Sequence, residues 1–406
     1  MQSEFIIVGA GIGGLAAALA LGRVGRSVLV LEQAQAFAEA GAGIQLGPNA
    51  VRVLQALGLQ QALDEVAAWP ERLQALDAQS GRVLGTLPLG QDFVNRYGAP
   101  YLTLHRADLH ELLLRAQDSA LVRIERASAV ASVSQSTQAV SATVSDGRRY
   151  QGVGLLACDG LWSSVRRQVW ADAGARATGH IAYRALLDGS ELPAQVARDQ
   201  VSVWLGPALH AVAYPVRRGT AMNLVVVTQA QRRALAGDAT DGLAASWDMD
   251  SDGQACMQAL RGMHAGLAGL AQAVPAQRWR CWTLHERAPM LGPGEMARGR
   301  IALLGDAAHP MRPYLAQGAA MALEDAQALA QAVQGEAQNL ALAFKRYAQQ
   351  RWRRNARVQR KARLNGTVFH AQGALRVARN LAMRLSAGRL MDMPWLYAQP
   401  KPNPAS

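Results

Sequence analysis

The chain has 406 residues, half of them hydrophobic and 18% charged, which is enough to bury the core of two domains or of one large α/β body. Its three cysteines, Cys158, Cys256 and Cys281, form no C-x-x-C pair and no metal-ligand spacing, which argues against a disulfide framework and a metal site. This usage favours a reducing, cytoplasmic compartment. No apolar run is long enough to span a bilayer, so we expect no stable membrane insertion.

The net charge of +12 raises the question of an anionic partner. Much of the excess lies in residues 345–363, KRYAQQRWRRNARVQRKAR, whose spacing is typical of a helix with one basic face. We interpret this segment as a solvated helix face that pairs with acids elsewhere, and we expect no nucleic-acid partner. Docking to a membrane or to nucleic acid through the same face is the alternative.

The first predicted elements are a strand, a tight turn, a helix and a second strand. The turn, Gly9–Gly14, reads GAGIGG and matches G-x-G-x-x-G, and the second strand ends on Glu32. In this pattern Gly9 permits the turn, Gly11 lets the backbone approach a pyrophosphate and Gly14 lets the helix pack on the strand. The helix N-terminus attracts phosphate, and Glu32 can accept the hydroxyls of an adenosine ribose. The sequence therefore predicts a dinucleotide fold.

The remaining elements alternate between α/β and β-rich stretches. In chain order we predict a Gly-rich loop at 41–50 and a helix, strands at 70–100, a helix entry at 103–114, a strand meander at 121–150, a buried strand at 153–158, strands at 181–227, a helix at 238–274, a buried strand at 301–304 and helices from 318 to 389. This order predicts an α/β fold in which a Rossmann-like FAD-binding domain is interleaved with a β-sheet-rich substrate lobe, followed by C-terminal helices. The expected boundaries are 1–70, 101–178 and 280–345 for the FAD-binding domain, 71–100 and 179–279 for the substrate lobe, and 346–406 for the C-terminal helices.

Two further strand ends favour FAD over a nicotinamide dinucleotide. The buried strands at 153–158 and 301–304 end in Asp159-Gly160 and Gly305-Asp306. FAD is long, and an Asp at the carboxyl end of a strand can hold its ribityl hydroxyls. The chain has no second G-x-G-x-x-G in the right context and no paired redox cysteines, which disfavours a separate nicotinamide domain and a disulfide reductase.

These motifs together resemble the single-component FAD-dependent aromatic hydroxylases, which share the fold of p-hydroxybenzoate hydroxylase. The resemblance covers nearly the whole chain and rests on four segments: GAGIGG (9–14), LHRADL (104–109), ACDGLWSSVRR (157–167) and GDAAHPMRPYLAQGAAMALEDA (305–326). Within the family the chain is most similar to salicylate hydroxylase, 3-hydroxybenzoate 6-hydroxylase and 6-hydroxynicotinate 3-monooxygenase. The resemblance implies a monooxygenase that uses NADH or NADPH and O2 to hydroxylate a small phenolic acid through a flavin C4a-hydroperoxide.

The resemblance also assigns roles to individual residues. Arg106 would contact the FAD phosphates, Asp306 the ribityl chain, and Pro313 would lie by the flavin ring where oxygen reacts. The full implied cofactor set is Gly9, Gly11, Gly14, Glu32, Gly43, Arg106, Asp159, Gly160, Asp306, Gly318 and Ala319. Gly318 and Ala319 begin a helix whose N–H groups would stabilise negative charge on the reduced flavin. The alternative for Asp159 is a cap on the next helix.

The substrate residues are predicted from a strand at 209–215. Its alternation places His210, Val212 and Tyr214 on one face. Hydroxylation of a phenol needs a base near the phenol oxygen, and the resemblance makes His210 that base with Tyr214 as its partner. Other predicted substrate contacts are Gln45, where the pyridine enzyme has a histidine, Tyr314, and Arg184 as the partner of a carboxylate. His309 is interpreted as a packed loop residue.

Three alternatives remain open at this point. One is a 6-hydroxynicotinate-type pyridine hydroxylase, and another is an FAD hydroxylase or reductase for a lipid-tailed substrate at a membrane. The third is a flavoprotein that binds nucleic acid. A homodimer is a further prediction, and the aromatic substrate and the choice between NADH and NADPH are left undetermined.

Overall fold

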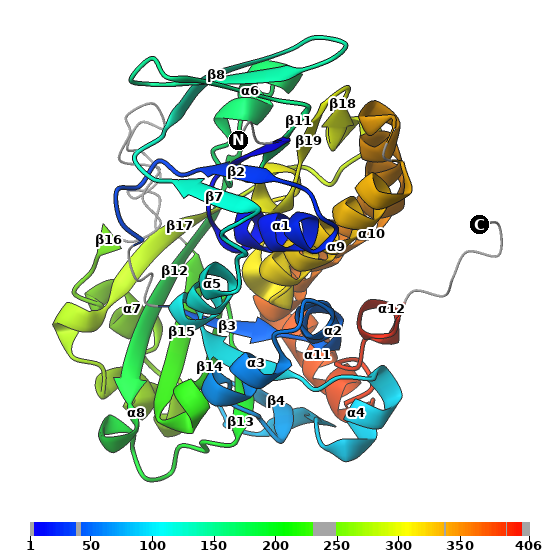
Figure 1. Cartoon of the computed structure of the whole chain (residues 1–406). Helices are drawn as coiled ribbons and strands as arrows, with labels where there is room; N and C mark the ends of the chain where they lie inside the picture. The colour runs from blue at the N-terminus through cyan, green and yellow to red at the C-terminus, as the bar shows by residue number, and fades with distance from the viewer. Residues whose placement is uncertain (1–3, 38–41, 230–248, 337, 387, 400–406) are drawn as a thin grey trace.

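The computed structural model describes residues 4–37, 42–229, 249–336, 338–386 and 388–399. The predicted loop residue Gly41, positions 238–248 of a predicted helix and the chain after residue 399 lie outside these ranges. Figure 1 shows two joined layers: an upper α/β body built from both ends of the chain, and the green strands of a large sheet below it. The α/β fold class predicted from the sequence is confirmed.

The upper body is built on a six-stranded sheet. Its strands, in spatial order, are β18 (Ala297–Arg298), β19 (Ile301–Leu303), β11 (Gly154–Ala157), β1 (Phe5–Val8), β2 (Val28–Leu31) and β7 (Val122–Glu125). The pairs from β19 to β7 are parallel, and β18 is antiparallel to β19. Every residue of β1, β2, β11 and β19 is buried, as expected for parallel strands covered on both faces.

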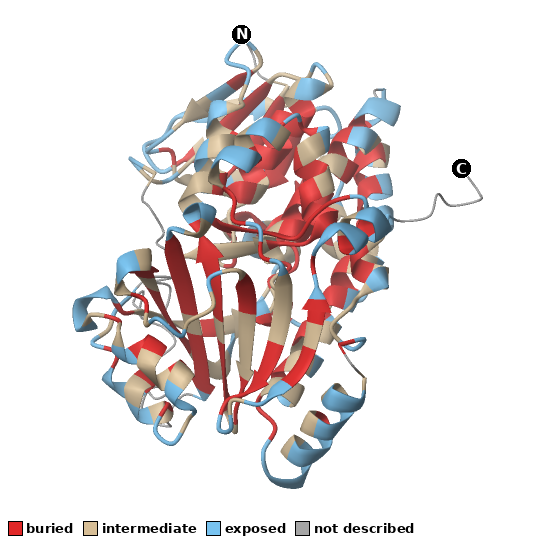
Figure 2. Cartoon of the chain, turned by 90° about the horizontal axis from the view of Figure 1, so that it is seen from below, coloured by how far each residue is buried: buried red, intermediate tan, exposed pale blue. Residues whose placement is uncertain are grey.

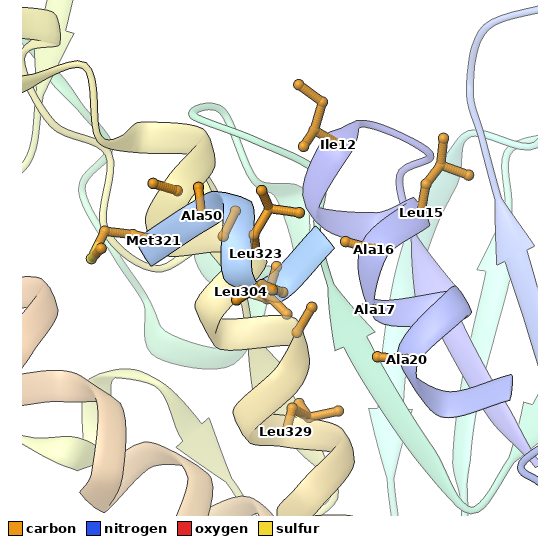
Figure 3. Close-up of a cluster of buried hydrophobic side chains, with 14 of the residues drawn as sticks. Ile12, Leu15, Ala16, Ala17, Ala20, Ala50, Leu304, Met321, Leu323 and Leu329 are labelled. Carbon is orange, nitrogen blue, oxygen red and sulfur yellow. The ribbon is translucent and has the colours of Figure 1, made fainter. Parts of the chain in front are cut away.

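The helices of this body are α1 (Ile12–Arg23), α2 (Pro48–Ala56), α3 (Gln60–Val66), α5 (Arg106–Arg115), α6 (Ser164–Trp170) and α9 (Gly318–Gly335). α1 packs on β1, β2 and β7, α5 and α9 pack on α1, α2 packs on α9, and α3 packs on α5. Small side chains on α1 allow it to lie close to α9: a Cβ on Gly13 would meet Leu304 Cδ2 at 2.8 Å and Ala322 Cβ at 3.3 Å. Figure 3 shows the apolar cluster in which α1, α2 and α9 meet. A three-stranded meander flanks the sheet, with β8 (Val130–Gln135), β9 (Val140–Val144) and β10 (Arg149–Gly152).

The lower layer is an eight-stranded mixed sheet. Its order is β16 (Met249–Asp250), β17 (Arg280–Glu286), β12 (Arg176–Asp188), β15 (Ala221–Gln229), β14 (Leu209–Val216), β13 (Gln200–Leu205), β4 (Arg72–Asp77) and β5 (Val83–Pro88). One face is covered by α7 (Gln254–Ala259) and α8 (Ala265–Gln272), which form a separate apolar core with it. Figure 2, seen from below, shows the buried central strands and the more exposed helices beside them.

The structure differs from the sequence expectations in three segments. β17 pairs with β12, so residues 280–286 join this sheet although the expected boundary at 280 assigned them to the FAD-binding domain. Residues 91–97, expected among strands, form helix α4 (Gln91–Tyr97). Within the described part of 238–274, α7 and α8 replace the single helix that was expected. The division into domains stays a prediction.

The C-terminal helices are α10 (Leu340–Phe369), α11 (Gly373–Leu385) and α12 (Pro394–Tyr397). The basic segment lies in α10, which runs beside α9 (Figure 1). Its arginines partly pair with acids, as predicted: Arg351 and Arg354 bind Glu324, and Arg363 binds Glu286. None of the helices in the described ranges combines the length and apolar character needed to cross a membrane.

Candidate active site

The glycine turn lies at the carboxyl end of β1. Gly9 has a φ of 97°, and a Cβ there would meet Cys158 O at 2.6 Å. A Cβ on Gly14 would meet Gly9 O at 2.0 Å, so α1 touches the turn through glycine. At Gly11 the opposite holds, because no described atom lies within 4 Å of an added Cβ. Gly11 also begins α1 without a side-chain cap among the described residues. The turn therefore presents open backbone and free N–H groups, as a pyrophosphate requires.

Glu32 lies against the same turn. Its Oε2 accepts a hydrogen bond from Ala10 N at 2.8 Å, and its Oε1 accepts one from Ala34 N at 2.8 Å. The carboxylate thus fixes the glycine turn to the end of β2, a role in addition to the predicted ribose contact. Each oxygen retains a further lone pair for a ribose hydroxyl.

The second acidic motif follows β11, the neighbour of β1. Asp159 Oδ2 accepts hydrogen bonds from Ser164 Oγ and Val165 N, both at 3.2 Å, so Asp159 caps α6. Its Oδ1 is buried without a hydrogen-bond partner in the described part of the chain. Burial raises the pKa of Asp159, and hydrogen bonds from the α6 N-terminus oppose the rise. Gly160 follows with a φ of 76°. The uncompensated oxygen is the kind of atom that a bound ligand satisfies.

The third acidic motif follows β19 and lies at the start of α9. A Cβ on Gly318 would lie 3.9 Å from Asp306 Oδ1. Gly318 and the neighbouring Ala319 begin this 18-residue helix, which has no side-chain cap in the described ranges. Arg166 holds the Asp306 loop by donating to Ala307 O at 3.2 Å and Ala308 O at 2.6 Å. Asp306 and the α9 N-terminus therefore lie side by side.

Arg106 begins α5 and lies near Asp306. Its side chain is exposed to solvent. Burial nonetheless lowers the pKa of Arg106, Asp306 raises it, and Arg184 lowers it further. Arg106 is therefore close enough to both Asp306 and Arg184 for their charges to affect its pKa.

These features fit FAD. Gly9, Asp159 and Asp306 follow the carboxyl ends of three adjacent parallel strands, where ligands bind in open α/β sheets. The open space at Gly11, the orphaned Asp159 oxygen and the uncapped starts of α1 and α9 suit phosphates, hydroxyls and an anionic ring edge. No feature of the described site disagrees with the predicted cofactor.

The substrate residues lie on the sheet face opposite α7 and α8. Strand register places Ala182, Val227 and His210 in one row across β12, β15 and β14. The next row on this face holds Arg184, Val225 and Val212, and the third holds Asn223 and Tyr214. His210 and Tyr214 are thus separated by about 13 Å along β14, with Val212 between them on the same face. Ala182 and Val227 are buried in a cluster with Tyr314, whereas Val212 and Val225 are half-buried beside Arg184 and Tyr214. An apolar patch edged by polar groups suits an aromatic acid.

Tyr214 is held by residues of the predicted Gly-rich segment 41–50, part of which forms a short strand. Gly43, in β3 (Gly43–Leu46), donates its N–H to Asn223 Oδ1 at 2.7 Å, and a Cβ there would meet Tyr214 Cε2 at 2.6 Å. β3 pairs with β6 (Leu102–His105). Gln45 Oε1 accepts a hydrogen bond from Tyr101 OH at 2.8 Å, and the side-chain amide of Gln45 donates to Tyr214. Burial raises the pKa of Tyr214, and Gln45 and Arg184 oppose the rise.

His210 is buried in a group of aromatic rings. Its ring lies 4.9 Å from that of Tyr314 and 5.3 Å from that of Phe369. Its Nδ1 lies 2.7 Å from Nε2 of His370. Burial, with His370 and His180, lowers the pKa of His210 well below its usual value, so the ring is neutral near pH 7. A neutral imidazole is the form that can accept a proton.

The predicted residues fall into two groups. The glycine turn with Glu32 and the Asp306–Arg106 region lie at the strand ends of the upper sheet, while His210, Tyr214, Gln45, Arg184 and Tyr314 gather on the face of the lower sheet. Pro313 is exposed, next to buried Tyr314. His309 is fully buried and bonds Asp325 at 2.5 Å, as expected for a packed loop residue. In the described ranges, no group of three or more His, Cys, Asp or Glu residues could hold a metal ion.

Sequence reasoning missed several residues at the substrate face. They are His180, Asn223, Tyr101, Phe369 and His370. Each reaches the site through a contact between segments that are distant in the chain, such as the 160 positions between His210 and His370. No local pattern in the sequence marks them.

Gly14→Ala is expected to yield protein without FAD. The added Cβ must move α1 away from Gly9 O, which lies only 2.0 Å from its position, and overpacking of this kind costs about 1–3 kcal/mol. Flavin absorbance and thermal unfolding measure both effects. Gly269→Ala is the matched control in α8, where no described atom lies within 4 Å of the new Cβ; it should keep FAD and be slightly stabilised. Full flavin occupancy in Gly14→Ala would show that this contact is dispensable.

Asp306→Ala is expected to lose its yellow colour during purification. A charged hydrogen bond contributes about 1.5–3 kcal/mol, so the Kd for FAD should rise by about tenfold to a hundredfold. Asp306→Asn is the matched control, because it keeps a hydrogen-bonding group of the same size and should retain more FAD than the alanine variant. Titration of the apoprotein with FAD gives both constants. Equal FAD affinity in Asp306→Ala and wild type would remove Asp306 from the site.

Comparisons with known proteins agree with this geometry. The family model described as FAD binding domain matches residues 2–362. A 3-hydroxybenzoate 6-hydroxylase of Polaromonas naphthalenivorans is 38% identical over 395 residues, 97% of this chain and 95% of that protein. A 6-hydroxynicotinate 3-monooxygenase of Bordetella bronchiseptica is 34% identical over 364 residues, 88% of this chain and 90% of that protein.

The solved structures agree as well. HpxO of Klebsiella pneumoniae, complexed with FAD and uric acid, has a TM-score of 0.82 at 26% identity and covers 96% of this chain and 94% of its own. The resemblance stated from the sequence and the FAD cofactor are thus confirmed. The chain belongs to the FAD binding domain family and is an FAD-dependent aromatic-ring monooxygenase.

Proposed function

We propose that this enzyme hydroxylates a small phenolic acid of the 3-hydroxybenzoate or salicylate type, with NADH or NADPH and O2 as co-substrates. The observation that carries the proposal is the sheet face on which buried His210 and buried Arg184 flank a surface of valines. A base and a cation separated by an apolar surface match a phenol and a carboxylate on one ring. The similarity to a 3-hydroxybenzoate 6-hydroxylase over 97% of the chain supports the same substrate class.

Each residue of this face has a task that its environment permits. FAD, when bound, takes electrons from the nicotinamide co-substrate and delivers one oxygen atom to the ring. His210, neutral because burial lowers its pKa, accepts the phenol proton and so makes the ring electron-rich. Arg184 pairs with the carboxylate, while Trp282 covers its guanidinium at 5.2 Å from the ring centroid. Tyr214, fixed by Gln45 and Gly43, orients the ring.

The test is a screen of phenolic acids for faster NADH oxidation by the yellow protein. Product is identified by mass spectrometry, and peroxide is measured separately because a poor substrate can uncouple oxidation from hydroxylation. 6-Hydroxynicotinate belongs in the same screen and distinguishes the pyridine alternative. If FAD-loaded protein converts none of these acids, the proposed substrate class is wrong.

Arg184→Met is expected to raise KM for the phenolic acid by about tenfold to a hundredfold. The reason is the loss of a hydrogen bond between charged groups, which contributes about 1.5–3 kcal/mol. The corresponding benzamide, which carries no charge, is the control substrate and should lose much less. Steady-state kinetics with coupled product analysis measures both. An equal loss for acid and amide would show that Arg184 does not bind the carboxylate.

The proposal extends to location and assembly. Cys158, Cys256 and Cys281 form no disulfide within the part of the chain that the structure describes, which supports a cytoplasmic enzyme. A homodimer is supported by α11, where Val377, Leu381 and Leu385 follow each other at four-residue spacing and are all exposed. Light scattering of the purified protein measures its mass in solution.

A further inference from the structure

The C-terminal helices place a second imidazole beside His210. His370 follows directly after α10, and its C=O accepts a hydrogen bond from Ala208 N at 3.3 Å. Arg379 of α11 clamps this end of α10 by donating to Val368 O at 3.2 Å and Phe369 O at 2.9 Å. The position of the His370 ring is therefore set by the packing of α10 and α11 on the substrate sheet.

The two rings meet through particular nitrogens. Nδ1 of His210 lies 2.7 Å from Nε2 of His370. Between two neutral imidazoles this bond holds one hydrogen, so one ring donates and the other accepts. If His370 donated, His210 would carry its own hydrogen on Nε2 and could not take up a proton there. If His210 donates, its Nε2 keeps a lone pair.

We propose that His370 is a positioning residue that accepts the Nδ1–H of His210 and so keeps Nε2 of His210 available for the phenol proton. The inference rests on the proposed function, since it assigns a partner to the base of that reaction. In the step itself, the phenol O–H bond breaks, its hydrogen goes to Nε2 of His210, and the electron pair stays on the phenolate oxygen. The bond from Nδ1–H to His370 then stabilises the imidazolium that forms.

The charges around His370 keep it neutral. The groups that face the pair are His180 from β12, Tyr314 beside α10, Arg379 from α11, and Arg312, which is paired with Glu286 of β17 at 2.8 Å. Burial, followed by His180, Arg312 and Arg379, lowers the pKa of His370 to about 3. His370 therefore acts on His210 as a neutral acceptor and not as a charge.

The kinetic test compares His370→Leu with His370→Gln. Glutamine keeps an acceptor oxygen near the position of Nε2, whereas leucine fills the space without one. In single-turnover mixing of reduced enzyme, phenolic acid and O2 at pH 7, we expect hydroxylation to fall by about tenfold to a hundredfold in His370→Leu and by less than about threefold in His370→Gln. The missing product should appear as peroxide. FAD content and substrate Kd should match wild type in both variants.

The pH dependence separates this role from packing. A phenol with a pKa of about 10 ionises by itself as the pH rises, so the deficit of His370→Leu should shrink towards that pH. A deficit that stays constant with pH, or a wild-type rate in His370→Leu at pH 7, overturns the inference. If wild type hydroxylates no phenolic acid at all, the proposed function fails instead, and the rates say nothing against His370.

A spectroscopic test needs neither substrate nor turnover. The chain has eight histidines, so 15N-histidine labelling gives a small set of ring signals to assign by variants. We expect the Nδ1–H tautomer at His210 in wild type and in His370→Gln. An Nε2–H tautomer at His210 in wild type overturns the inference, even where His370→Leu does not fold.

Discussion

His210→Asn is expected to keep FAD and to bind the phenolic acid, while hydroxylation slows by about 10²- to 10⁴-fold. Asparagine fits the strand position and can hydrogen-bond, but its amide cannot take the phenol proton. His370 and His180 also lie near this face, so the product that remains in the variant measures how far either ring replaces His210. Rapid mixing of reduced enzyme with oxygen resolves the hydroxylation step, and peroxide release reports the unproductive path.

The hydroxylation rates of wild type and His210→Asn should depend on pH in different ways. Because the pKa of His210 lies well below 6.5, wild type should hold the base form from pH 6 to 9 and show a flat profile there. The variant should improve as pH rises and the substrate ionises without help. His264→Asn is the matched control: His264 caps α8 through Gly266 N at 3.1 Å, and asparagine caps helices well. Hydroxylation by His210→Asn at the wild-type rate across this pH range would remove His210 from its role.

The cofactor half of the site could be predicted because its signals are local. Each of the three strands ends on a glycine or acid motif within a few residues, and parallel strand ends meet at one edge of the sheet. Asp159 shows the limit of such patterns. Its motif predicted a ligand contact, its neighbours predicted a helix cap, and the structure shows the cap together with an orphaned oxygen that a ligand could satisfy.

The substrate half could be predicted only along single strands. Alternation in 209–215 correctly placed His210 and Tyr214 on one face, but strand pairing decides what stands beside them. Gly43 was assigned to the flavin loop, and the structure adds a second reason for a glycine: Tyr214 and Asn223 approach so closely that a side chain would clash. Contacts of this kind join segments about 180 positions apart and leave no periodic signal.

The basic segment illustrates how charge counts mislead when acids are distant in sequence. Arg351 is buried, and its guanidinium donates to Asp325 Oδ1 and Glu324 Oε2, both at 2.7 Å. Asp325 also bonds His309 and accepts from Gly305 N at 3.4 Å. The buried cluster of α9 and α10 therefore supports the loop that carries Asp306. Part of the positive charge of the chain is therefore buried, where it stabilises the loop next to the cofactor site.

Arg351→Met is accordingly expected to lower the free energy of unfolding by about 3–5 kcal/mol. The change leaves Asp325 and Glu324 buried with fewer partners, and such uncompensated charge is costly. FAD affinity should fall as well, because the Asp306 loop loses support. Urea unfolding followed by circular dichroism measures the first effect and flavin titration the second. Arg360→Met, on the exposed side of the same helix, is the matched control and should change stability by less than about 0.5 kcal/mol.

The acid limb of stability tests the same cluster. Burial alone would raise the pKa of Asp325. The interactions with His309 and Arg351 outweigh burial and lower this pKa to about 2. A carboxylate with a depressed pKa stabilises the fold fully above its unfolded pKa of about 4, and this contribution is lost as pH falls towards 2. Without Arg351 the pKa of Asp325 rises, so acid unfolding of Arg351→Met should begin at higher pH than in wild type or Arg360→Met. Coincident acid transitions in all three proteins would mean that Asp325 draws its stabilisation from His309 alone.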